Sequence, residues 1–570
     1  MNAELLLQHF EHLSEAPDAI PRLRRFILDL AVRGKLVEQD PNDESAAAWL
    51  KRLAAKRAQL FNSGEIRKDK LLPPIPEDAL PFELPSGWAW ERLGNIGETN
   101  IGLTYSPQDI SEQGTPVLRS SNIQNGRLDF SDLVRVKDKP KQSVMVQQND
   151  LLICARNGSR ALVGKVAVIE GLKEPAAFGA FMAIFRSEAN RYLYHFICSA
   201  LFRQVIAEVN TTTINQITQN NLRSTLAPIP PHAEQHRIVA RVDELMALCD
   251  QLEAAQAERE SRRDRLVASS LNGLNNGTDA GGFREHARFY FNHLPRLTTK
   301  SEHIQQLRQT ILSLAVRGKL VPQDPNDEPA AELLNRIQAE KAVAVKEGEI
   351  KKIDSVDTPS ASHFPSELPA GWEPAYLQSL CISVTDGDHL PPPQVDHGIP
   401  FLVIGDVRSQ TITFKGCRYV AEEYYDGLDS IRRPKKGDVL YTLVGSYGIP
   451  VMVTDDRQFC VQRHIGILRP SKNINAGFLN RALESKWVFN QATACATGIA
   501  QKTVPLSGLR KILVPLPPVA EQQRIVAKVD ELMALCDQLE TQLNITETDS
   551  RRLLEAAVHE AVAHAQGTTT

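Results

Sequence analysis

The sequence predicts an α+β protein in which two similar globular domains are separated by long antiparallel coiled-coil helices, with a pseudo-twofold internal repeat. Three observations predict this fold class. Long segments recur along the 570-residue chain at a nearly constant spacing. The stretches between them mix short β-like runs with helical patterns. Each half also ends in an apolar pattern that alternates by four and three residues, which is typical of a coiled-coil seam.

The repeated segments keep the same order in both halves. Ala233–Glu253 returns as Ala520–Glu540 with 19 identities in 21 residues, and Leu30–Val37 returns unchanged as Leu314–Val321. Two shorter segments, QDPNDE and LPxGW, also recur, at 39–44 and 323–328 and at 84–88 and 368–372. The residues between the LPxGW and AEQ segments have diverged almost beyond recognition. The sequence therefore predicts two different domains on one repeated frame.

The first frame segment is predicted to be an amphipathic helix. Pro21 suits a first helical turn, and Gly34 suits a left-handed C-terminal cap. The apolar residues between them share one helix face: Phe26, Ile27, Leu30 and Ala31. A second charged helical stretch follows. The proline-rich segment Leu72–Pro85 then cannot sustain a helix or a central strand, so it is interpreted as a linker into the next domain.

Each diverged block, 89–226 and 373–513, is predicted to mix strands with helix. The strand-like runs of the first block are followed by a helix near Tyr192–Val209; they are Pro116–Leu118, Leu133–Val136, Asp150–Cys154, Lys165–Ile169 and Phe181–Phe185. The second block has similar runs and a helix near Gly477–Ala494; the runs are Phe401–Val403, Asp438–Thr442, Pro450–Val453 and His464–Leu468. The two blocks are interpreted as one fold with changed surfaces.

A long helix is predicted after the proline-rich end of each block. The seam positions of the first helix are Ile238, Val242, Leu245, Cys249 and Leu252, and those of the second are Ile525, Val529, Leu532, Cys536 and Leu539. Such a seam is often ordinary core packing, but two near-identical seams in one chain favour pairing of the two helices into a rod of up to ~60 Å. The predicted segments are 1–85 (helical region and linker), 86–230 (first domain), 231–275 (central helix), 276–372 (helical repeat region and linker), 373–517 (second domain) and 518–570 (C-terminal helix).

Charge is distributed unevenly along the chain. The formal net charge is −4, but residues 89–226 and 373–513 each carry +3, which leaves −10 for the rest. Positive charge therefore lies on the diverged blocks, where a phosphate backbone would be met if they bind DNA. The excess is small, and chance segregation of charge is an alternative explanation.

The composition predicts a soluble cytoplasmic protein without a membrane segment. No run of 18 apolar residues occurs, and the first residues are acidic rather than those of a secretory signal. The eight cysteines form no CxxC pair. We therefore expect structural thiols rather than disulfides or zinc ligands.

Catalytic motifs were sought, and each candidate fails. The segment 158–165 (GSRALVGK) has five residues between its glycines where a phosphate-binding loop needs four. The segment 559–564 (HEAVAH) is one residue too long for the HExxH zinc motif. Motifs for adenine methylation or DNA cleavage are also missing from the sequence. We therefore expect no catalytic residue and no metal site in this chain.

Taken together, these residues resemble the specificity subunit (HsdS) of a type I restriction-modification system. The resemblance covers nearly the whole chain and rests on the tandem architecture together with the LPxGW, PIPP-AEQxRIV and VDELMALCDQLE segments. It implies two target recognition domains that each read one half of an asymmetric bipartite site on double-stranded DNA, with the helices setting the unread spacer. It also implies a non-catalytic subunit of a larger endonuclease and methyltransferase complex.

The partners and cofactors follow from the same resemblance. Two methylase subunits (HsdM) would dock on the repeated helices and use S-adenosylmethionine to methylate adenine. Two motor-nuclease subunits (HsdR) would complete the complex with ATP and magnesium. No cofactor is expected on this chain itself.

Polar residues at strand ends and in turns are the candidates for DNA contact, because hydroxyl, amide and guanidinium groups suit base edges and phosphates. In the first block they are Arg119, Asn122, Arg156, Asn157, Ser159, Arg160, Thr212, Asn215, Gln216 and Thr218. In the second block they are Ser446, Tyr447, Arg463, Gln501, Lys502 and Thr503. We expect Gly445–Tyr447 to match Gly158–Arg160, and Arg463 to match Phe181. An ordinary polar loop remains the alternative at each position.

Two other classes of function stay open from the sequence. A two-module coiled-coil scaffold that binds proteins without recognising DNA would explain the repeat and the helices. It would not explain divergence confined to two basic, loop-rich blocks. A self-sufficient nuclease would need a catalytic motif that the sequence lacks.

Overall fold

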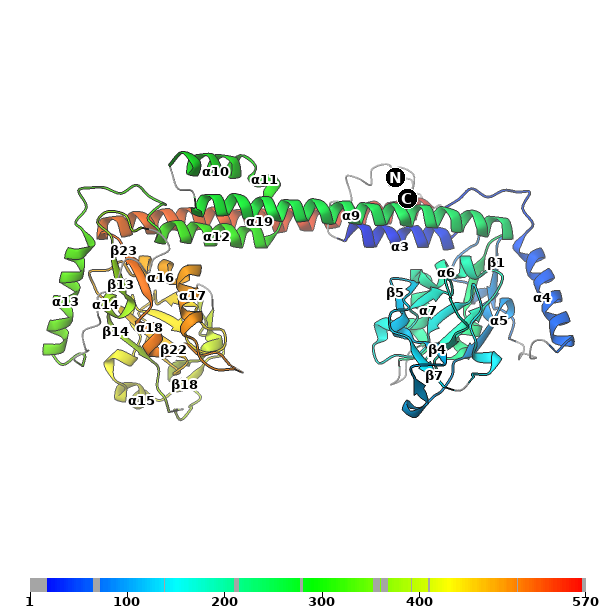
Figure 1. Cartoon of the computed structure of the whole chain (residues 1–570), viewed down its shortest axis with the longest axis horizontal. Helices are drawn as coiled ribbons and strands as arrows, with labels where there is room; N and C mark the ends of the chain where they lie inside the picture. The colour runs from blue at the N-terminus through cyan, green and yellow to red at the C-terminus, as the bar shows by residue number, and fades with distance from the viewer. Residues whose placement is uncertain are drawn as a thin grey trace. The chain divides into compact units, whose positions relative to one another are not determined.

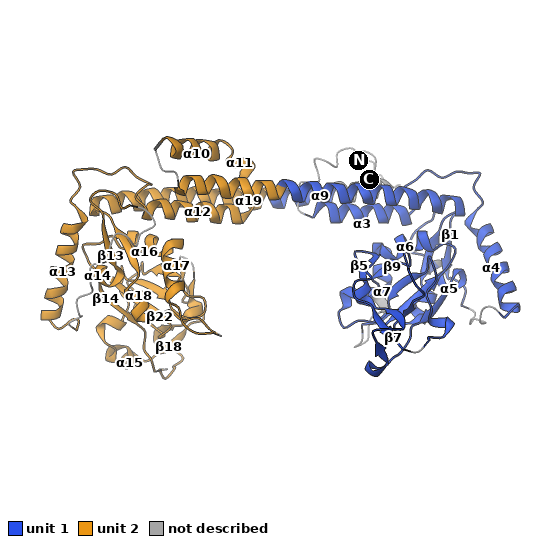
Figure 2. Ribbon diagram, viewed as in Figure 1, with its two compact units in different colours: residues 1–259, 547–570 blue, residues 260–546 orange. Residues whose placement is uncertain are grey.

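The computed structural model describes residues 18–64, 72–137, 139–209, 215–276, 280–351, 359, 367–390, 392–408, 411–499 and 501–565 (Figure 1). The chain forms two compact units, residues 1–259 with 547–570 and residues 260–546 (Figure 2). Each unit combines a helical frame with one mixed α+β domain. The prediction of an α+β fold with two repeated domains and long helices is thus confirmed.

The repeated sequence segments of the first unit meet at one joint. The helix α3 (Ala19–Val32) ends where Gly34 adopts a φ of +66°, as predicted from its cap position. A Cβ on Gly34 would lie 2.6 Å from Cγ of Pro85, so only glycine fits there. The Trp88 indole donates a hydrogen bond of 3.1 Å to the Glu234 carboxylate, and Arg237 pairs with Asp43 at 2.6 Å.

The second unit builds the same joint from the second copy. Gly318 has a φ of +64°, and its Cβ would lie 2.4 Å from Cγ of Pro369. Trp372 donates to Glu521 at 2.9 Å, and Arg524 pairs with Asp327 at 2.6 Å. The repeated segments therefore contact one another within each unit, which explains why they recur together.

The first domain lies between β1 (Ala89–Arg92) and β12 (Leu226–Ile229), which pair antiparallel. Its main antiparallel sheet has the order β2-β11-β8-β9, with the bounds Glu98–Ile101, Met182–Arg186, Leu151–Cys154 and Val166–Val168. A second sheet has the order β10-β4-β7-β3, with the bounds Ala177–Phe178, Thr115–Leu118, Val134–Val136 and Ile110–Ser111. A small hairpin joins β5 (Ile123–Gln124) to β6 (Arg127–Leu128).

Both faces of the main sheet are buried, which explains the continuous apolar runs of its strands. On β8, Leu151 and Ile153 belong to the core shared with the helical frame, while Leu152 and Cys154 belong to a second core inside the domain. Five helices complete the first unit's described part before its long helix: α4 (Ala46–Asn62), α5 (Leu93–Ile96), α6 (Asn190–Cys198), α7 (Ala200–Val209) and α8 (Gln219–Ser224).

The second domain repeats this plan between β13 (Glu373–Tyr376) and β23 (Leu513–Leu516), which also pair antiparallel. Its main sheet has the order β14-β22-β19-β20, with the bounds Cys381–Asp386, Ile465–Pro470, Val439–Thr442 and Pro450–Met452. The order matches β2-β11-β8-β9 strand for strand. Smaller sheets are β18-β15-β21 (Arg418–Val420, Ile399–Leu402, Cys460–Val461) and β16-β17 (Val407–Arg408, Thr411–Ile412).

The helices of the second unit include α10 (Ala280–Asn292), α11 (Leu294–Leu297), α12 (Ser301–Val316), α13 (Ala330–Lys346), α14 (Leu377–Leu380), α15 (Glu422–Gly427), α16 (Ala476–Glu484), α17 (Lys486–Cys495) and α18 (Leu506–Arg510). The single helix predicted near Tyr192–Val209 is two helices, and so is the one predicted near Gly477–Ala494. A buried serine, Ser199 or Ser485, separates each pair. Its hydroxyl donates to the carbonyl of the preceding turn at 2.6 Å and accepts from the amide of the next helix at 3.4 Å.

The predicted seam is buried in both long helices, α9 (His232–Asn276) and α19 (Val519–Ala565). Ile238, Val242, Leu245 and Cys249 are at most 5% exposed, and Ile525, Val529 and Cys536 at most 1%; Leu252, Leu532 and Leu539 pack at the margin. The two predicted seams do not pack against each other: that of α9 lies in one core with a third helix, α3, and that of α19 lies in a separate core with a third helix, α12 (Figure 1). The heptad pattern of the long helices alone does not reveal this third helix.

The two long helices run antiparallel within the second unit. Lys300 and His303 of α12 pair with Asp264 of α9, and Arg317 donates to the carbonyl of Asn275, so α9 runs parallel to α12. Arg308 of α12 instead pairs with Asp537, far along α19, while the start of α19 meets the segment that follows α12. The predicted antiparallel direction is confirmed there.

Candidate nucleic-acid interface

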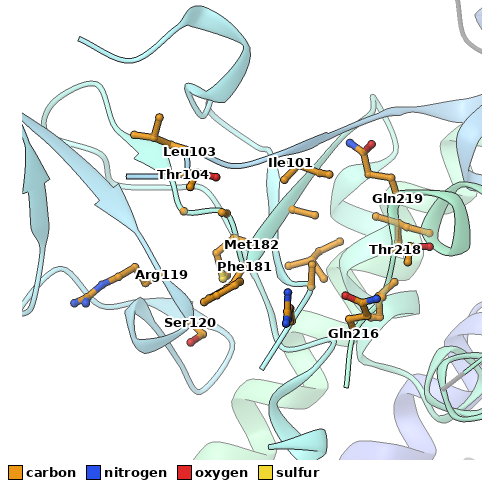
Figure 3. Close-up of a pocket in the computed structure, with 18 of the residues that line it drawn as sticks. Ile101, Leu103, Thr104, Arg119, Ser120, Phe181, Met182, Gln216, Thr218 and Gln219 are labelled. Carbon is orange, nitrogen blue, oxygen red and sulfur yellow. The ribbon is translucent and has the colours of Figure 1, made fainter. Parts of the chain in front are cut away.

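A hollow of about 800 Å³ opens beside the main sheet of the first domain (Figure 3). It lies where β2, β4 and β8 end, at the turn before β11 and at the segment before α8. Apolar side chains make up much of its lining, including Ile101, Leu103, Phe181 and Met182. Polar side chains also line it: Arg119, Arg156, Gln216, Thr218 and Gln219. A concave surface with a few polar groups among apolar ones is suited to binding a ligand.

Backbone hydrogen bonds fix the loops around this hollow. The carbonyl of Phe181 accepts from the amides of Ala155 and Arg156 at 2.9 and 3.0 Å. The carbonyl of Ala155 accepts from the amide of Ile217 at 2.7 Å. Three segments that are far apart in sequence are therefore held as one rigid surface at the end of the sheet.

Phe181 and Arg156 form an exposed pair on this surface. The Phe181 side chain is 61% exposed, and the Arg156 guanidinium carbon lies 5.5 Å from the centre of its ring. A cation above an aromatic face is attracted to it. Among the described residues, no carboxylate pairs with Arg156, so its planar donors remain available for a phosphate or a guanine edge.

Two predicted contact residues, Asn122 and Arg119, take part in the structure of a turn. Asn122 is 1% exposed; its amide donates to the carbonyls of Asp129 and Asp132, and its oxygen accepts from the amide of Arg119. The Arg119 side chain pairs with Asp132 at 3.0 Å. These residues order the turn after β4.

Three other predicted residues shape loops. Asn157 accepts from the amide of Ser159 at 2.9 Å, and Asn215 donates to the carbonyl of Gly158 at 3.1 Å. Thr218 caps α8 by accepting from the amide of Asn221 at 3.1 Å. Ser159 and Arg160 are exposed, while Gln216 is half-buried in the wall of the hollow. Thr212 lies outside the described residues.

The second domain holds its predicted residues on the corresponding loops. The carbonyl of Lys502 accepts from the amide of Gly445 at 3.0 Å, and the carbonyl of Leu443 accepts from the amide of Val504 at 2.8 Å. Ser446, Gln501 and Lys502 are exposed, and Thr503 is half-buried. Tyr447 stacks on Phe489 at 5.6 Å and donates its hydroxyl to Thr493 at 3.1 Å, so it supports the loop.

The expected matches between the two domains need correction by one residue. Gly179 and Gln462 occupy the same bridge beside the strand that each follows, so Arg463 matches Ala180 and His464 matches Phe181. The carbonyl of His464 accepts from Leu443 just as that of Phe181 accepts from Ala155. By the same ladder, Gly445 matches Asn157. The loops between Cys154 and Gly164 and between Thr442 and Gly448 also differ by four residues, which hid this register in the sequence.

The exchange of Phe181 for His464 changes the electrostatics of the surface. Partial burial, together with the charge of the neighbouring Arg463, lowers the pKa of His464 below its ordinary value. The imidazole is therefore neutral at neutral pH, with one donor and one acceptor for hydrogen bonds. The first domain offers an aromatic face at the same place.

Sequence reasoning missed Phe181 and His464 as candidates. Phe181 and His464 sit in a turn before a strand, where their exposure depends on hydrogen bonds to distant loops. Gln219 is the first residue of α8, and its amide donates to the carbonyl of Thr99 at 3.1 Å. Phe181 and His464 share one sequence signal, because each lies directly before a strand that recurs in the two domains.

The helical frame presents the same exposed residues in both units. Leu248 is 48% exposed and Leu535 is 47% exposed, at matching positions of α9 and α19. Their neighbours on the same face are also exposed and identical in the two copies: Glu244 and Glu531, Ala247 and Ala534, Gln251 and Gln538. Internal packing does not account for the identity of exposed side chains.

Within the described ranges, no helix has the length and apolar character needed to cross a membrane.

Comparisons with known proteins bear on this geometry. The family model described as "Type I restriction modification DNA specificity domain" matches residues 85–259 and 395–546. The chain is 32% identical over 570 residues to the type I restriction enzyme EcoAI specificity subunit of Escherichia coli, a match that covers 95% of this chain and 94% of that protein. It is 31% identical over 573 residues to the EcoEI specificity subunit of the same species, covering 95% and 94%. The crystal structure of the HsdS subunit from Thermoanaerobacter tengcongensis aligns at 18% identity with a TM-score of 0.42, covering 84% of this chain and 98% of that one.

Proposed function

Because the chain belongs to the family of type I restriction-modification DNA specificity proteins, we propose that its two domains each read one half of a bipartite, asymmetric DNA site. We place these recognition domains at residues 86–230 and 373–517. The chain supplies specificity to a restriction-modification complex, and the chemistry of methylation and cleavage belongs to its partners.

One observation carries this proposal: the two units share the same helical frame and sheet, but their loop surfaces differ. The strand orders of the two main sheets are the same, and so are the joints at Trp88 and Trp372. The residue in the turn before the strand differs, Phe181 against His464, and the adjoining loop is four residues shorter in the second domain. Two different surfaces on one scaffold suit two different half-sites.

The proposed reading surface of each domain consists of predicted residues that are exposed or half-buried and that face the solvent or the hollow. In the first domain these are Arg156, Ser159, Arg160 and Gln216, with Phe181 added by the structure. In the second domain they are Ser446, Arg463, Gln501, Lys502 and Thr503, with His464 added. Arginine and amide side chains can read base edges in the major groove, and lysine and hydroxyl groups can hold phosphates. The other predicted residues support these loops: Arg119, Asn122, Asn157, Asn215, Thr218 and Tyr447.

The long helices are proposed to set the unread spacer between the two half-sites. They contain 45 and 47 residues, and each enters the helical frame of both units. A helix rises by about 1.5 Å per residue and resists compression along its axis. A spacer of fixed length would follow from such a frame.

The repeated exposed face of the long helices is proposed to dock two copies of one partner, the methylase subunit (HsdM). The face centres on Leu248 in one unit and Leu535 in the other, each flanked by the same glutamate, alanine and glutamine. Two identical partners need two identical surfaces, which supports this assignment. S-adenosylmethionine would bind to these partners, and two motor-nuclease subunits (HsdR) would bring ATP and magnesium.

A genome-wide map of methylated adenine tests the proposal, compared between the native host and a strain that lacks this gene. We expect the loss of one bipartite motif with a fixed gap. A strain that retains an active methylase partner and loses no motif would contradict the proposal.

A protein-binding scaffold is the second candidate, and the repeated docking face favours it in part. It would leave the methylation map unchanged while the long helices still bound a partner. The difference between the two loop surfaces would then have no consequence for DNA.

A further inference from the structure

The second recognition domain carries an apolar side chain at the tip of a short hairpin. Ile499 has a relative exposure of 105%, the highest among the large apolar side chains that the structure describes; the next is Leu390 at 75%. An isoleucine gains stability when it leaves water, and this one has no contact with its own core. A contact outside the chain would therefore be favourable for this side chain.

The hairpin holds Ile499 outward. Thr497 and Thr503 exchange two backbone hydrogen bonds of 2.8 Å, which close the loop between them. Gly498 has a φ of +99°, and a Cβ there would lie 2.4 Å from the carbonyl oxygen of Gln501, so the turn requires glycine.

The base of the hairpin is fixed to the reading surface. The carbonyl of Lys502 accepts from Gly445, and the amide of Val504 donates to Leu443. Leu443 also donates its amide to the carbonyl of His464, 2.9 Å away. Ile499 thus stands on the same ladder that positions Ser446 and His464.

The neighbours of Ile499 indicate a nucleic-acid contact. Thr497, Gln501 and Lys502 are all exposed around it. No described carboxylate forms an ion pair with Lys502, which leaves its charge available for a phosphate. The hairpin thus has a small apolar tip surrounded by hydroxyl, amide and ammonium groups. It is complementary to a polar groove that exposes one apolar group.

The major groove of DNA has that character. It is about 12 Å wide and admits a two-stranded ribbon, and the 5-methyl group of thymine is the apolar feature on its base edges. We propose that Ile499 contacts the 5-methyl group of a thymine in the half-site that residues 373–517 read. This proposal rests on the proposed function and adds to it one base position and the group that is read.

The test uses the assembled methylase complex with the full chain, and duplexes that carry the methylated motif. Each thymine of the half-site is replaced in turn by deoxyuridine, which removes only the methyl group. At one position we expect the wild-type complex to lose affinity by about fourfold, the worth of one buried methyl-sized group. The Ile499→Ser complex should bind the thymine and deoxyuridine duplexes equally, because the coupled partner is already absent.

A matched variant controls for the loss of an exposed apolar side chain. Ile110, on the edge strand β3 of the first domain, is 45% exposed and lies outside the proposed reading surfaces. Ile110→Ser should keep the wild-type response to deoxyuridine. Because Ile499 and Ile110 are both exposed, neither change should alter the thermal melting of the chain, and this is measured alongside.

Three outcomes would overturn the inference: equal wild-type affinity for thymine and deoxyuridine at every position, an equal deoxyuridine effect in Ile499→Ser, or a half-site without thymine on either strand. A failure of the proposed function looks different. In that case replacing residues 373–517 with the equivalent domain of another family member would leave the methylated motif unchanged, independently of the residue at Ile499.

Discussion

The two recognition domains agree closely at the frame and differ at the opposite end of the sheet. At the frame, Arg237 and Asp43 pair at 2.6 Å, and so do Arg524 and Asp327. At the reading end, an exposed phenylalanine corresponds to a histidine, and the loops change length. The contrast teaches that the frame keeps the same residue contacts in both units, while surface loops on the same sheet differ in length and in side chains.

The largest expected effect comes from breaking the common joint. Trp372 is 5% exposed, and its indole donates to Glu521, whose pKa is raised mainly by burial. Trp372→Ala leaves a cavity and removes a donor from a buried carboxylate, so we expect the free energy of unfolding to fall by about 3–5 kcal/mol. This loss is measured by chemical denaturation, with hydrogen exchange reporting on each unit separately.

Trp88→Ala is the matched variant, because Trp88 makes the same bond to Glu234. The two losses should be similar, each confined to its own unit. If only one of the two variants lost stability, the comparison would fail. The two joints would then have the same geometry but contribute different free energies of unfolding.

A smaller effect should appear on acidification of the first unit. His195 is 5% exposed, and burial, with a contribution from Arg191, lowers its pKa to about 4. Asp243 lies 3.6 Å away but is mostly exposed, so it does not offset burial. The neutral imidazole is favoured in the folded unit, while the unfolded chain takes up a proton near pH 6.5. Stability is therefore lost as pH falls from 6.5 to about 4, by roughly 3 kcal/mol at most.

The second unit has Arg481 at the position of His195, paired with Asp530 at 2.8 Å. It should not show this loss, because the guanidinium remains charged across that range. Hydrogen exchange in each unit, corrected for the intrinsic effect of pH, separates the two. His195→Gln should remove the difference; an equal acid response in both units of the wild type would refute the assignment to His195.

A substitution on the reading surface of the first domain should have the smallest effect on stability. Its effect on DNA binding should be selective. Arg156→Ala removes an exposed guanidinium that stands over Phe181 and pairs with no described carboxylate. We expect affinity for the complete site to fall by about 10- to 100-fold, with discrimination relaxed in one half-site only. Competition binding with duplexes altered in either half measures this. Relaxation in both halves would contradict separate readers.

Much of the fold could be predicted because it depends on local patterns. The Gly34 cap, the strand-like runs and the seam of the long helices each follow from a few neighbouring residues. Ser199 and Ser485 were not recognised as helix breaks, because a serine within a helical pattern breaks the helix only when its buried hydroxyl finds both backbone partners. The third helix at each seam also depends on tertiary packing.

The reading surface could be predicted only as a set of loops. Asn122 looks like a surface amide in sequence but is buried and fully bonded, and Tyr447 is occupied by Phe489 and Thr493. Phe181 looks like a core residue but is exposed. Asn122 is turned inward by hydrogen bonds within its own turn, while Tyr447 and the turn at Phe181 are held by segments that are distant in the sequence.

The most direct test of two readers on one frame is a chain in which residues 86–230 are replaced by a copy of residues 373–517. The adenine methylation map of a host that expresses this chain with its methylase partner is then determined. The account predicts a symmetric bipartite motif, with the second half-site repeated in inverted orientation across a fixed gap. An unchanged asymmetric motif would contradict it, because the first domain would then not be the source of the first half-site.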